Sequence, residues 1–258
     1  MPLSTYQFSF NGLTFGAGTR YVVTNVIGLA GMMPLRTQDD NRGYQDATWS
    51  GRDFYDARTV QMSLLITGDN TYSAQYYYNL AQKAFAPQQL GYPDTLTLFQ
   101  FQLSADTGAK RMYGRVRALE TAVDPEFTYG YIVANLTLYF PDPRYYDETQ
   151  QTATIGTSAS PVANTGWATT LPTITIASPA ASFNINDSVT GNTMYFANVQ
   201  TGYPVVIDLL NRTITNNGYA RNILTAATTD WLSVPGSTTG QWKISTGSMS
   251  VAWRNAYV

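Results

Sequence analysis

The side chains best equipped for chemistry in this chain are carboxylates, arginines and tyrosines. Its 258 residues include no histidine and no cysteine. Without them there is no Ser-His-Asp triad, no thiol nucleophile, no disulfide and no thiolate zinc site. A catalytic site would have to be built from carboxylates, lysine or tyrosine alone.

The densest cluster of such side chains is the octapeptide FPDPRYYD, residues 140–147. It places one arginine and two aspartates beside two tyrosines, in a chain with only 12% charged residues. Pro141 and Pro143 cannot donate backbone hydrogen bonds, so they are expected to end the pairing of a strand. Two interpretations stay open at this point, a catalytic loop and a joint between two domains.

A second acidic pair is Asp39-Asp40, in the run DDNRG. The oxygen-bearing side chains there lack the spacing of an EF-hand calcium loop, so solvated carboxylates are expected. Carboxylates that cleave glycosides depend on a spatial gap that the sequence does not give, which leaves a carboxylate-based hydrolase open as a rival. Gly16-Ala17-Gly18 is too short for a dinucleotide fingerprint. We therefore predict no catalytic, cofactor-binding or metal-binding residues.

The overall charge argues against nucleic-acid and membrane partners. The net charge is -2, which gives no electrostatic footprint for nucleic acid and no basic patch for a membrane surface. No run approaches the roughly twenty apolar residues of a membrane span, and the N-terminus has no signal-peptide pattern.

Arginine dominates the positive charges, with twelve arginines and three lysines. The arginine guanidinium forms planar, two-pronged bonds that suit buried contacts between subunits. A surface with few charges and many arginines therefore indicates contacts with other proteins. Codon bias in a GC-rich genome would give the same ratio.

Alternation of apolar and polar residues with a period of two dominates the first half. It is clearest at 58–67, 96–103 and 131–140, where the apolar side chains fall on one face. Each run predicts a half-buried strand of an antiparallel sheet. Asn11-Gly12, between two shorter alternations, predicts a tight hairpin turn.

Residues 71–85 change the period and predict the one substantial helix. Asn70, Thr71 or Ser73 is expected to cap its start, and Pro87 to stop it. The side chains expected on its buried side are Tyr76, Tyr77, Leu80, Ala81 and Ala84.

After residue 147 the composition shifts to threonine, serine and alanine with almost no charge, which marks a domain boundary. Beyond it, short apolar runs with frequent turns, including Asn217-Gly218, predict a second β-sandwich. In its last strand Met249, Val251 and Trp253 are expected to point inward. The strands are expected at 173–176, 183–185, 194–196, 205–208, 212–215, 242–245 and 249–254.

Several short motifs follow one another in a recognisable order along the chain. In the first half they are the FSFNG hairpin, Tyr21–Leu29, Gly43–Asp46, Asp56-Ala57-Arg58, Tyr113–Arg115 and FPDPRYYD. In the second half they are TGNTMYF, YPVVIDLLNRTITNNG, WLSVPG and SMSVAWRNAYV. Together they resemble the distal tail proteins of long-tailed (siphovirus) phages, the Dit-like minor tail proteins.

This resemblance implies a mainly β fold of two β-sandwich domains. Residues 1–146 would form a ring-forming belt domain with one helix, and residues 147–258 a galectin-like jelly-roll sandwich. Galectins use a histidine in their sugar groove and this chain has none, so the resemblance extends to the shape of that domain and not to lectin activity.

The resemblance also implies a structural virion protein and not an enzyme. Six copies would form a ring at the distal end of the tail tube, as the hub of the tail tip or baseplate. The expected partners are other copies of the chain, the tail tube protein, the tail-associated baseplate protein and the tape-measure protein. The expected location is the tail tip of the virion, after assembly in the host cytoplasm.

Two sets of residues are assigned to this architecture. The inter-subunit contacts are expected to involve the loop 35–46 and four arginines. FPDPRYYD is expected to form the joint between the two domains. The arginines are Arg52, Arg58, Arg115 and Arg117, and the joint residues are Pro141, Pro143, Arg144, Tyr145 and Tyr146.

Three rival functions stay open from the sequence. The C-terminal sandwich would be a carbohydrate-binding module or adhesin if exposed tyrosines recognised a host cell-wall saccharide. The other two rivals are the carboxylate-based hydrolase and a β-rich capsid or spike protein.

Overall fold

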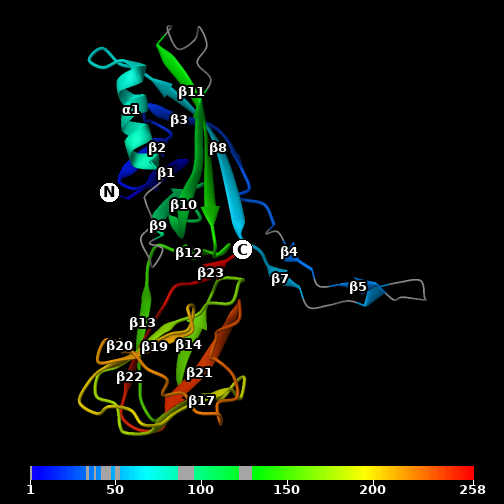
Figure 1. Cartoon of the computed structure of the whole chain (residues 1–258), viewed down its shortest axis with the longest axis vertical. Helices are drawn as coiled ribbons and strands as arrows, with labels where there is room; N and C mark the ends of the chain where they lie inside the picture. The colour runs from blue at the N-terminus through cyan, green and yellow to red at the C-terminus, as the bar shows by residue number, and fades with distance from the viewer. Residues whose placement is uncertain are drawn as a thin grey trace. The chain divides into compact units, whose positions relative to one another are not determined.

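The computed structural model describes residues 2–32, 35–37, 39–41, 48–49, 53–86, 96–121 and 130–258. The chain divides into two compact units, Met1–Glu148 with Val258 and Thr149–Tyr257, each with its own hydrophobic core (Figure 1). We call them unit 1 and unit 2. The division falls after Glu148, two residues beyond the boundary expected from the sequence. The described residues are mainly β, as predicted.

Unit 1 is built on one long antiparallel path of strands in the order β2-β1-β9-β10-β11-β8-β3, with β12 beside β10. The strands are β1 (Gln7–Phe10), β2 (Leu13–Gly16), β3 (Tyr21–Ile27), β8 (Arg58–Thr67), β9 (Thr97–Gln102), β10 (Lys110–Thr121), β11 (Tyr131–Phe140) and β12 (Tyr145–Asp147).

The predicted alternations form strands as expected. β8 and β11 pair along ten residues each, and every second side chain of both is buried. β1 and β2 form the predicted hairpin, with Asn11 at φ 47° and Gly12 at φ 79° in its turn. This positive φ is accessible to asparagine and glycine, which explains the choice of turn residues.

Strand β10 changes partner part-way along its length. Its residues 110–114 pair with β9, and residues 115–121 pair with β11. At the change lies Gly114, where an added Cβ would sit 2.4 Å from the Phe140 ring and 2.6 Å from the Tyr139 carbonyl oxygen. Glycine is required there because the two strands approach too closely for any side chain. β10 thus joins the β2-β1-β9 part of the strand path to the β11-β8-β3 part.

Helix α1 (Ala74–Phe85) packs against β8, β10 and β11 (Figure 1). Ser73 caps its start, where the Ser73 side chain accepts a hydrogen bond from the Tyr76 N–H. The predicted buried side is wrong in part, because Tyr76 and Leu80 are exposed. The buried residues are Ala74, Tyr78, Ala81 and Phe85.

Two short strand pairs complete the described part of unit 1. β4 (Leu35–Arg36) pairs with β7 (Phe54–Tyr55), and β5 (Asp40–Asn41) pairs with β6 (Thr48–Trp49). The predicted loop 35–46 is therefore described only in part. Its Gly43–Asp46 motif, Arg52 and Pro87 lie outside the described residues.

Unit 2 is a sandwich of two antiparallel sheets around one core. Their orders are β13-β22-β15-β18-β19-β20 and β14-β21-β16-β17. The strands are β13 (Gln151–Ile155), β14 (Ser160–Asn164), β15 (Thr173–Ile176), β16 (Phe183–Asp187), β17 (Thr193–Phe196), β18 (Val205–Asp208), β19 (Thr213–Asn216), β20 (Tyr219–Ala220), β21 (Thr238–Ile244), β22 (Met249–Trp253) and β23 (Ala256–Tyr257).

Most expected strands of unit 2 are present, and Met249, Val251 and Trp253 point inward as predicted. Arg212 is not part of its expected strand, because its φ of 52° places it in the turn before β19. Strands β13 and β14 were not expected, since their region looks like a linker by composition. Within the described residues, no helix is long and apolar enough to cross a membrane.

Candidate functional site

The residues of FPDPRYYD are held to one another by several contacts. Asp142 accepts hydrogen bonds from the Tyr146 hydroxyl at 2.5 Å and from the Arg144 N–H at 3.2 Å. Pro143 is buried and Pro141 is exposed. Burial of the Tyr146 ring, and then the nearby Asp142 carboxylate, raises the pKa of the Tyr146 hydroxyl. The side chains thus close a compact turn after β11.

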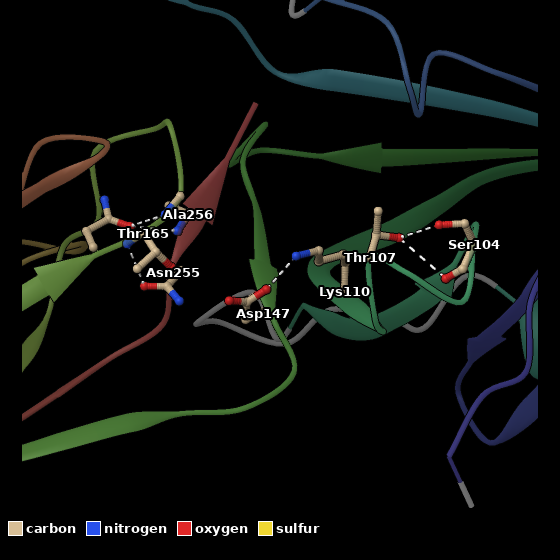
Figure 2. A network of polar contacts seen from close by, with 9 residues as sticks. Ser104, Thr107, Lys110, Asp147, Thr165, Asn255 and Ala256 are labelled. Carbon is tan, nitrogen blue, oxygen red and sulfur yellow. Dashed lines mark hydrogen bonds and ion pairs between the residues drawn. The ribbon is translucent and has the colours of Figure 1, made fainter.

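Two ion pairs hold the residues that follow this turn. β12 pairs with the start of β10, and the Lys110 ammonium lies 2.5 Å from the Asp147 carboxylate (Figure 2). The Arg111 guanidinium meets the Glu148 carboxylate through both Nε and Nη2. Partly buried, two-pronged pairs of this kind orient a segment better than exposed lysine pairs do. They bring Asp147 and Glu148 onto the sheet of unit 1.

Arg58 is a correction to the predicted interface. It is 2% exposed, and its Nη1 donates hydrogen bonds to the carbonyl oxygens of Gly28 and Leu29. Its guanidinium carbon lies 5.9 Å from the centre of the Tyr145 ring. Burial lowers the pKa of the guanidinium. Arg58 therefore stabilises the interior of unit 1 and does not offer its side chain to a neighbouring subunit.

Arg115 and Arg117 lie beside the same tyrosine ring, Arg117 exposed and Arg115 half-buried. Their guanidinium carbons lie 5.5 Å and 4.4 Å from the centre of the same ring, that of Tyr139 on β11. Cation–π contact of this kind is favourable and holds long side chains in place. We call Arg115, Arg117 and Tyr139 the arginine cluster. Arg52, the fourth predicted arginine, lies outside the described residues.

Among the described strands of unit 1, β3 lies at one end of the path, which the sequence did not predict. β3 ends the strand path of unit 1, and its Val22 and Ile27 side chains are exposed, Ile27 to 57%. An exposed strand edge with apolar side chains is a ready template for pairing with another chain. A sequence hint of this exposed strand is the apolar Ile27 directly before Gly28. The register shift between Val23 and Asn25 breaks the alternation of apolar and polar residues, so the pattern of the strand is hard to recognise.

A polar network joins the start of α1 to β3. Asp69 accepts hydrogen bonds from the Tyr77 hydroxyl at 2.6 Å and from the N–H groups of Thr71 and Tyr72. Led by the bond from Tyr77, these lower the pKa of Asp69 to about 2. Burial raises the pKa of Tyr21, whose hydroxyl donates to the Tyr77 carbonyl oxygen, to about 12. Every group in the network has a stabilising partner, which is typical of a structural site.

Among the described residues there is no group of three or more acidic side chains that could hold a metal ion. Asp39, in the described part of the predicted loop 35–46, is exposed. The described contacts of the named residues are hydrogen bonds, ion pairs and ring contacts within the chain.

The comparisons with known proteins agree with this description. Residues 165–257 match the family model of the siphovirus-type tail component, C-terminal domain. The SPP1 Dit protein, described as a paradigm of the hub of the adsorption apparatus in phages that infect Gram-positive bacteria, shares the fold with a TM-score of 0.72 and 16% identity. That match covers 99% of this chain and 100% of SPP1 Dit. The chain has a Dit-like fold.

Chains of a second phage baseplate are similar as well. A chain of the phage P2 baseplate in its activated conformation with calcium matches with a TM-score of 0.53 and 10% identity, over 98% of this chain and 99% of that one. The strontium form gives a TM-score of 0.51 and 9% identity, again over 98% and 99%. A comparison with curated proteins gives no match. The Dit-like fold thus spans both units, and the family model covers most of unit 2.

Proposed function

We propose that this chain is a structural hub protein at the distal end of a long-tailed phage's tail tube, where copies of it form a ring. The observation that carries the proposal is the Dit-like fold over 99% of the chain. The match of residues 165–257 to a tail-component family supports it at the level of sequence. The role is mechanical and requires no catalytic group.

A ring places particular demands on unit 1. Each copy needs two different surfaces that fit each other, so that repeated rotation closes the circle. β3 is one candidate surface, because it ends the described strand path of unit 1 and exposes the apolar side chains of Val22 and Ile27. The arginine cluster is a second, since the exposed Arg117 guanidinium on the Tyr139 ring suits a carboxylate or carbonyl of the next copy.

The remaining partners follow from the position in the virion. A ring at the end of the tube would contact the tail tube protein on one side and the tail-associated baseplate protein on the other, around the tape-measure protein. Six copies are the number that the family resemblance implies. Assembly would take place in the host cytoplasm, and the finished protein would reside at the tail tip.

Native mass spectrometry over a concentration series, with negative-stain microscopy, tests the ring. We expect a closed oligomer with a central opening. Ile27→Asp should convert it to smaller species, since a carboxylate at the β3 edge disfavours apolar contact. Val189→Asp, an equally exposed apolar position in unit 2, is the matched control. A protein that stays monomeric at every concentration would contradict the ring.

The arginine cluster is tested separately with the double variant Arg115→Glu, Arg117→Glu. We expect weaker assembly, and a melting temperature close to that of the unmodified chain would show that the exposed Arg117 and the half-buried Arg115 are replaced without loss of the fold. Arg212→Glu with Arg221→Glu, two exposed arginines of unit 2, gives the same charge change elsewhere. If both double variants assemble like the unmodified chain, the arginine cluster has no role in the ring.

A further inference from the structure

The dipeptide Asn-Gly occurs twice in the sequence, at Asn11-Gly12 and at Asn217-Gly218. Each pair forms the turn of a hairpin, between β1 and β2 in unit 1 and between β19 and β20 in unit 2 (Figure 1). The asparagines have φ values of 47° and 59°, and the glycines follow at 79° and 75°. The two turns therefore share their sequence and have similar backbone conformations.

An Asn-Gly pair can react with itself. The backbone nitrogen of the glycine attacks the amide carbon of the asparagine side chain and forms a C–N bond, while ammonia leaves with the side-chain nitrogen and the glycine proton. Water then opens the five-membered imide at either carbonyl, which gives aspartate or isoaspartate. Glycine favours the attack because it has no Cβ to shield its nitrogen, and the two groups are neighbours in the chain.

The side chain of Asn11 is fixed by a hydrogen bond to a distant segment. Its Nδ2 donates to the Ala84 carbonyl oxygen at 3.0 Å. Ala84 lies in the last turn of α1, where carbonyl oxygens have no partner within the helix. The bond thus caps the end of α1. Attack by the Gly12 nitrogen requires the Asn11 amide to turn towards its own backbone, which breaks this bond.

The side chain of Asn217 is not restrained in this way. Within the part of the chain that the structure describes, its amide makes no hydrogen bond, whereas its backbone N–H donates to the Pro204 carbonyl oxygen at 3.1 Å. Asn217 is half-buried and Gly218 is exposed, so water reaches the turn. The amide is therefore free to rotate towards the Gly218 nitrogen.

The preceding asparagine is a built-in contrast. Asn216 is 1% exposed, and its Oδ1 accepts a hydrogen bond from the Gln200 N–H at 2.8 Å. Its Nδ2 donates to the carbonyl oxygens of Gln200 and Tyr203. The nitrogen that would attack it is that of Asn217, which is already bonded to Pro204. Asn216 is thus held by its own bonds and by those of its neighbour.

We propose that Asn217 is a site of spontaneous deamidation and isoaspartate formation in the folded protein, whereas Asn11 and Asn216 are protected. The difference lies in the hydrogen bonds of the side chains, since the two Asn-Gly turns are otherwise alike. The proposal is independent of ring formation by unit 1.

Isoaspartate has a structural consequence at this turn. It inserts one additional methylene into the backbone of a two-residue loop, and such loops fix the register of their strands. β20 is held to β19 by two residue pairs, Thr215 with Ala220 and Asn216 with Tyr219, and it ends the described six-stranded sheet. The lengthened turn therefore releases β20 and leaves β19 as an exposed strand edge. Aspartate keeps the length of the backbone and preserves the pairing.

The experiment follows the full-length chain during incubation at mildly alkaline pH, which favours a deprotonated attacking nitrogen. Samples are digested and analysed by mass spectrometry for conversion of amide to acid, and isoaspartate is labelled with a protein isoaspartyl methyltransferase. Asn217 should convert faster than Asn11 by about two- to tenfold, the factor that corresponds to one ordinary hydrogen bond. In concentrated urea the two sites should convert at similar rates, since only the fold separates them.

Hydrogen exchange tests the consequence for the sheet. Aged protein should lose protection at residues 213–221, whereas the freshly prepared Asn217→Asp variant, which has the same charge but no added methylene, should keep it. Equal protection in the two proteins would refute the release of β20. The modification site itself is wrong if Asn11 converts as fast as Asn217 in the folded chain. It is also wrong if Asn217 stays intact over a period in which the urea-unfolded chain is converted.

Discussion

Single residues decide where the strands of unit 1 can approach each other. Gly114 lies where β10 leaves β9 for β11, against the Phe140 ring. Arg58 is a second residue with a local structural role. Its cation is buried, and its Nη1 donates hydrogen bonds to two backbone carbonyl oxygens. Both residues act through contacts of their own atoms, which makes each testable by substitution.

Gly114→Ala should destabilise the protein by about 2 kcal/mol, the usual range for inserting a methyl group into a packed core. Thermal unfolding followed by circular dichroism measures this change. Gly31→Ala is the control, because an added Cβ at Gly31 meets no atom within 4 Å. Equal melting temperatures for the two variants would contradict the close approach at Gly114.

Arg58→Ala should cost about 2–4 kcal/mol, because it leaves a void and two carbonyl oxygens without their donor. Arg58→Met fills most of the same volume and should cost less, since it also removes the penalty of a buried charge. Chemical denaturation gives both free energies. An alanine variant as stable as the methionine variant would argue against the packing role.

Asp69 makes stability depend on pH in the acidic range. Its pKa falls from 3.8 to about 2 in the folded protein, so the unfolded state binds more protons between these values. The contribution is fully present above about pH 4 and is lost as the pH falls towards 2. Asp69→Asn should therefore flatten the loss of stability in this window, measured by urea unfolding at several pH values. Asp106→Asn, at an exposed aspartate, should leave the slope unchanged.

At the level of elements, α1 depends on the cap that begins it. The helix has no acidic residue in its first turn, so the Ser73 side chain supplies the local stabilisation of its free N–H groups. Its buried face runs through Tyr78, Ala81 and Phe85, one position away from the face expected from the sequence.

Ser73→Ala should reduce stability by about 1 kcal/mol, the typical value of an N-cap hydrogen bond. Ser73→Asp should preserve the cap and add a favourable interaction with the helix dipole. The melting temperatures of the unmodified chain, Ser73→Ala and Ser73→Asp measure these differences in stability. A Ser73→Asp variant less stable than Ser73→Ala would contradict the capping role.

The sequence predicts elements well where the pattern of burial is simple. β8 and β11 are long, half-buried strands with strict alternation, and both are predicted to the residue. β13 and β14 escape prediction because threonine, serine and alanine give weak contrast between their two faces. In α1, tyrosines lie on both the buried and the exposed side of the helix. Which side faces the core therefore depends on tertiary packing, and the sequence pattern alone does not predict it.

The candidate sites were harder to predict than the elements. The sequence identified Arg115 and Arg117 by their shared strand face, and the structure places both on Tyr139. It placed Arg58 on the surface because arginine is rarely buried, and only the carbonyl oxygens of a distant segment explain the exception.

At the level of the whole molecule, the two units have separate cores, and the unit 2 cluster contains no residue before Ile155. Residues 149–258 expressed alone should therefore unfold cooperatively with a native near-ultraviolet signal. A fragment of residues 149–247 is the control, because it lacks β22, which lies between β13 and β15. A 149–258 fragment without a cooperative transition would show that unit 2 requires unit 1.

The shared strand β10 has a mechanical consequence for a tail component. The covalent backbone carries tension between the β1–β9 side and the β3–β8 side of unit 1 along β10 through Gly114, and also along the short connection from β2 to β3. Hydrogen-bonded pairs on either side are then strained together and not peeled apart one by one. Under stretching force, unit 1 is expected to yield in a single step.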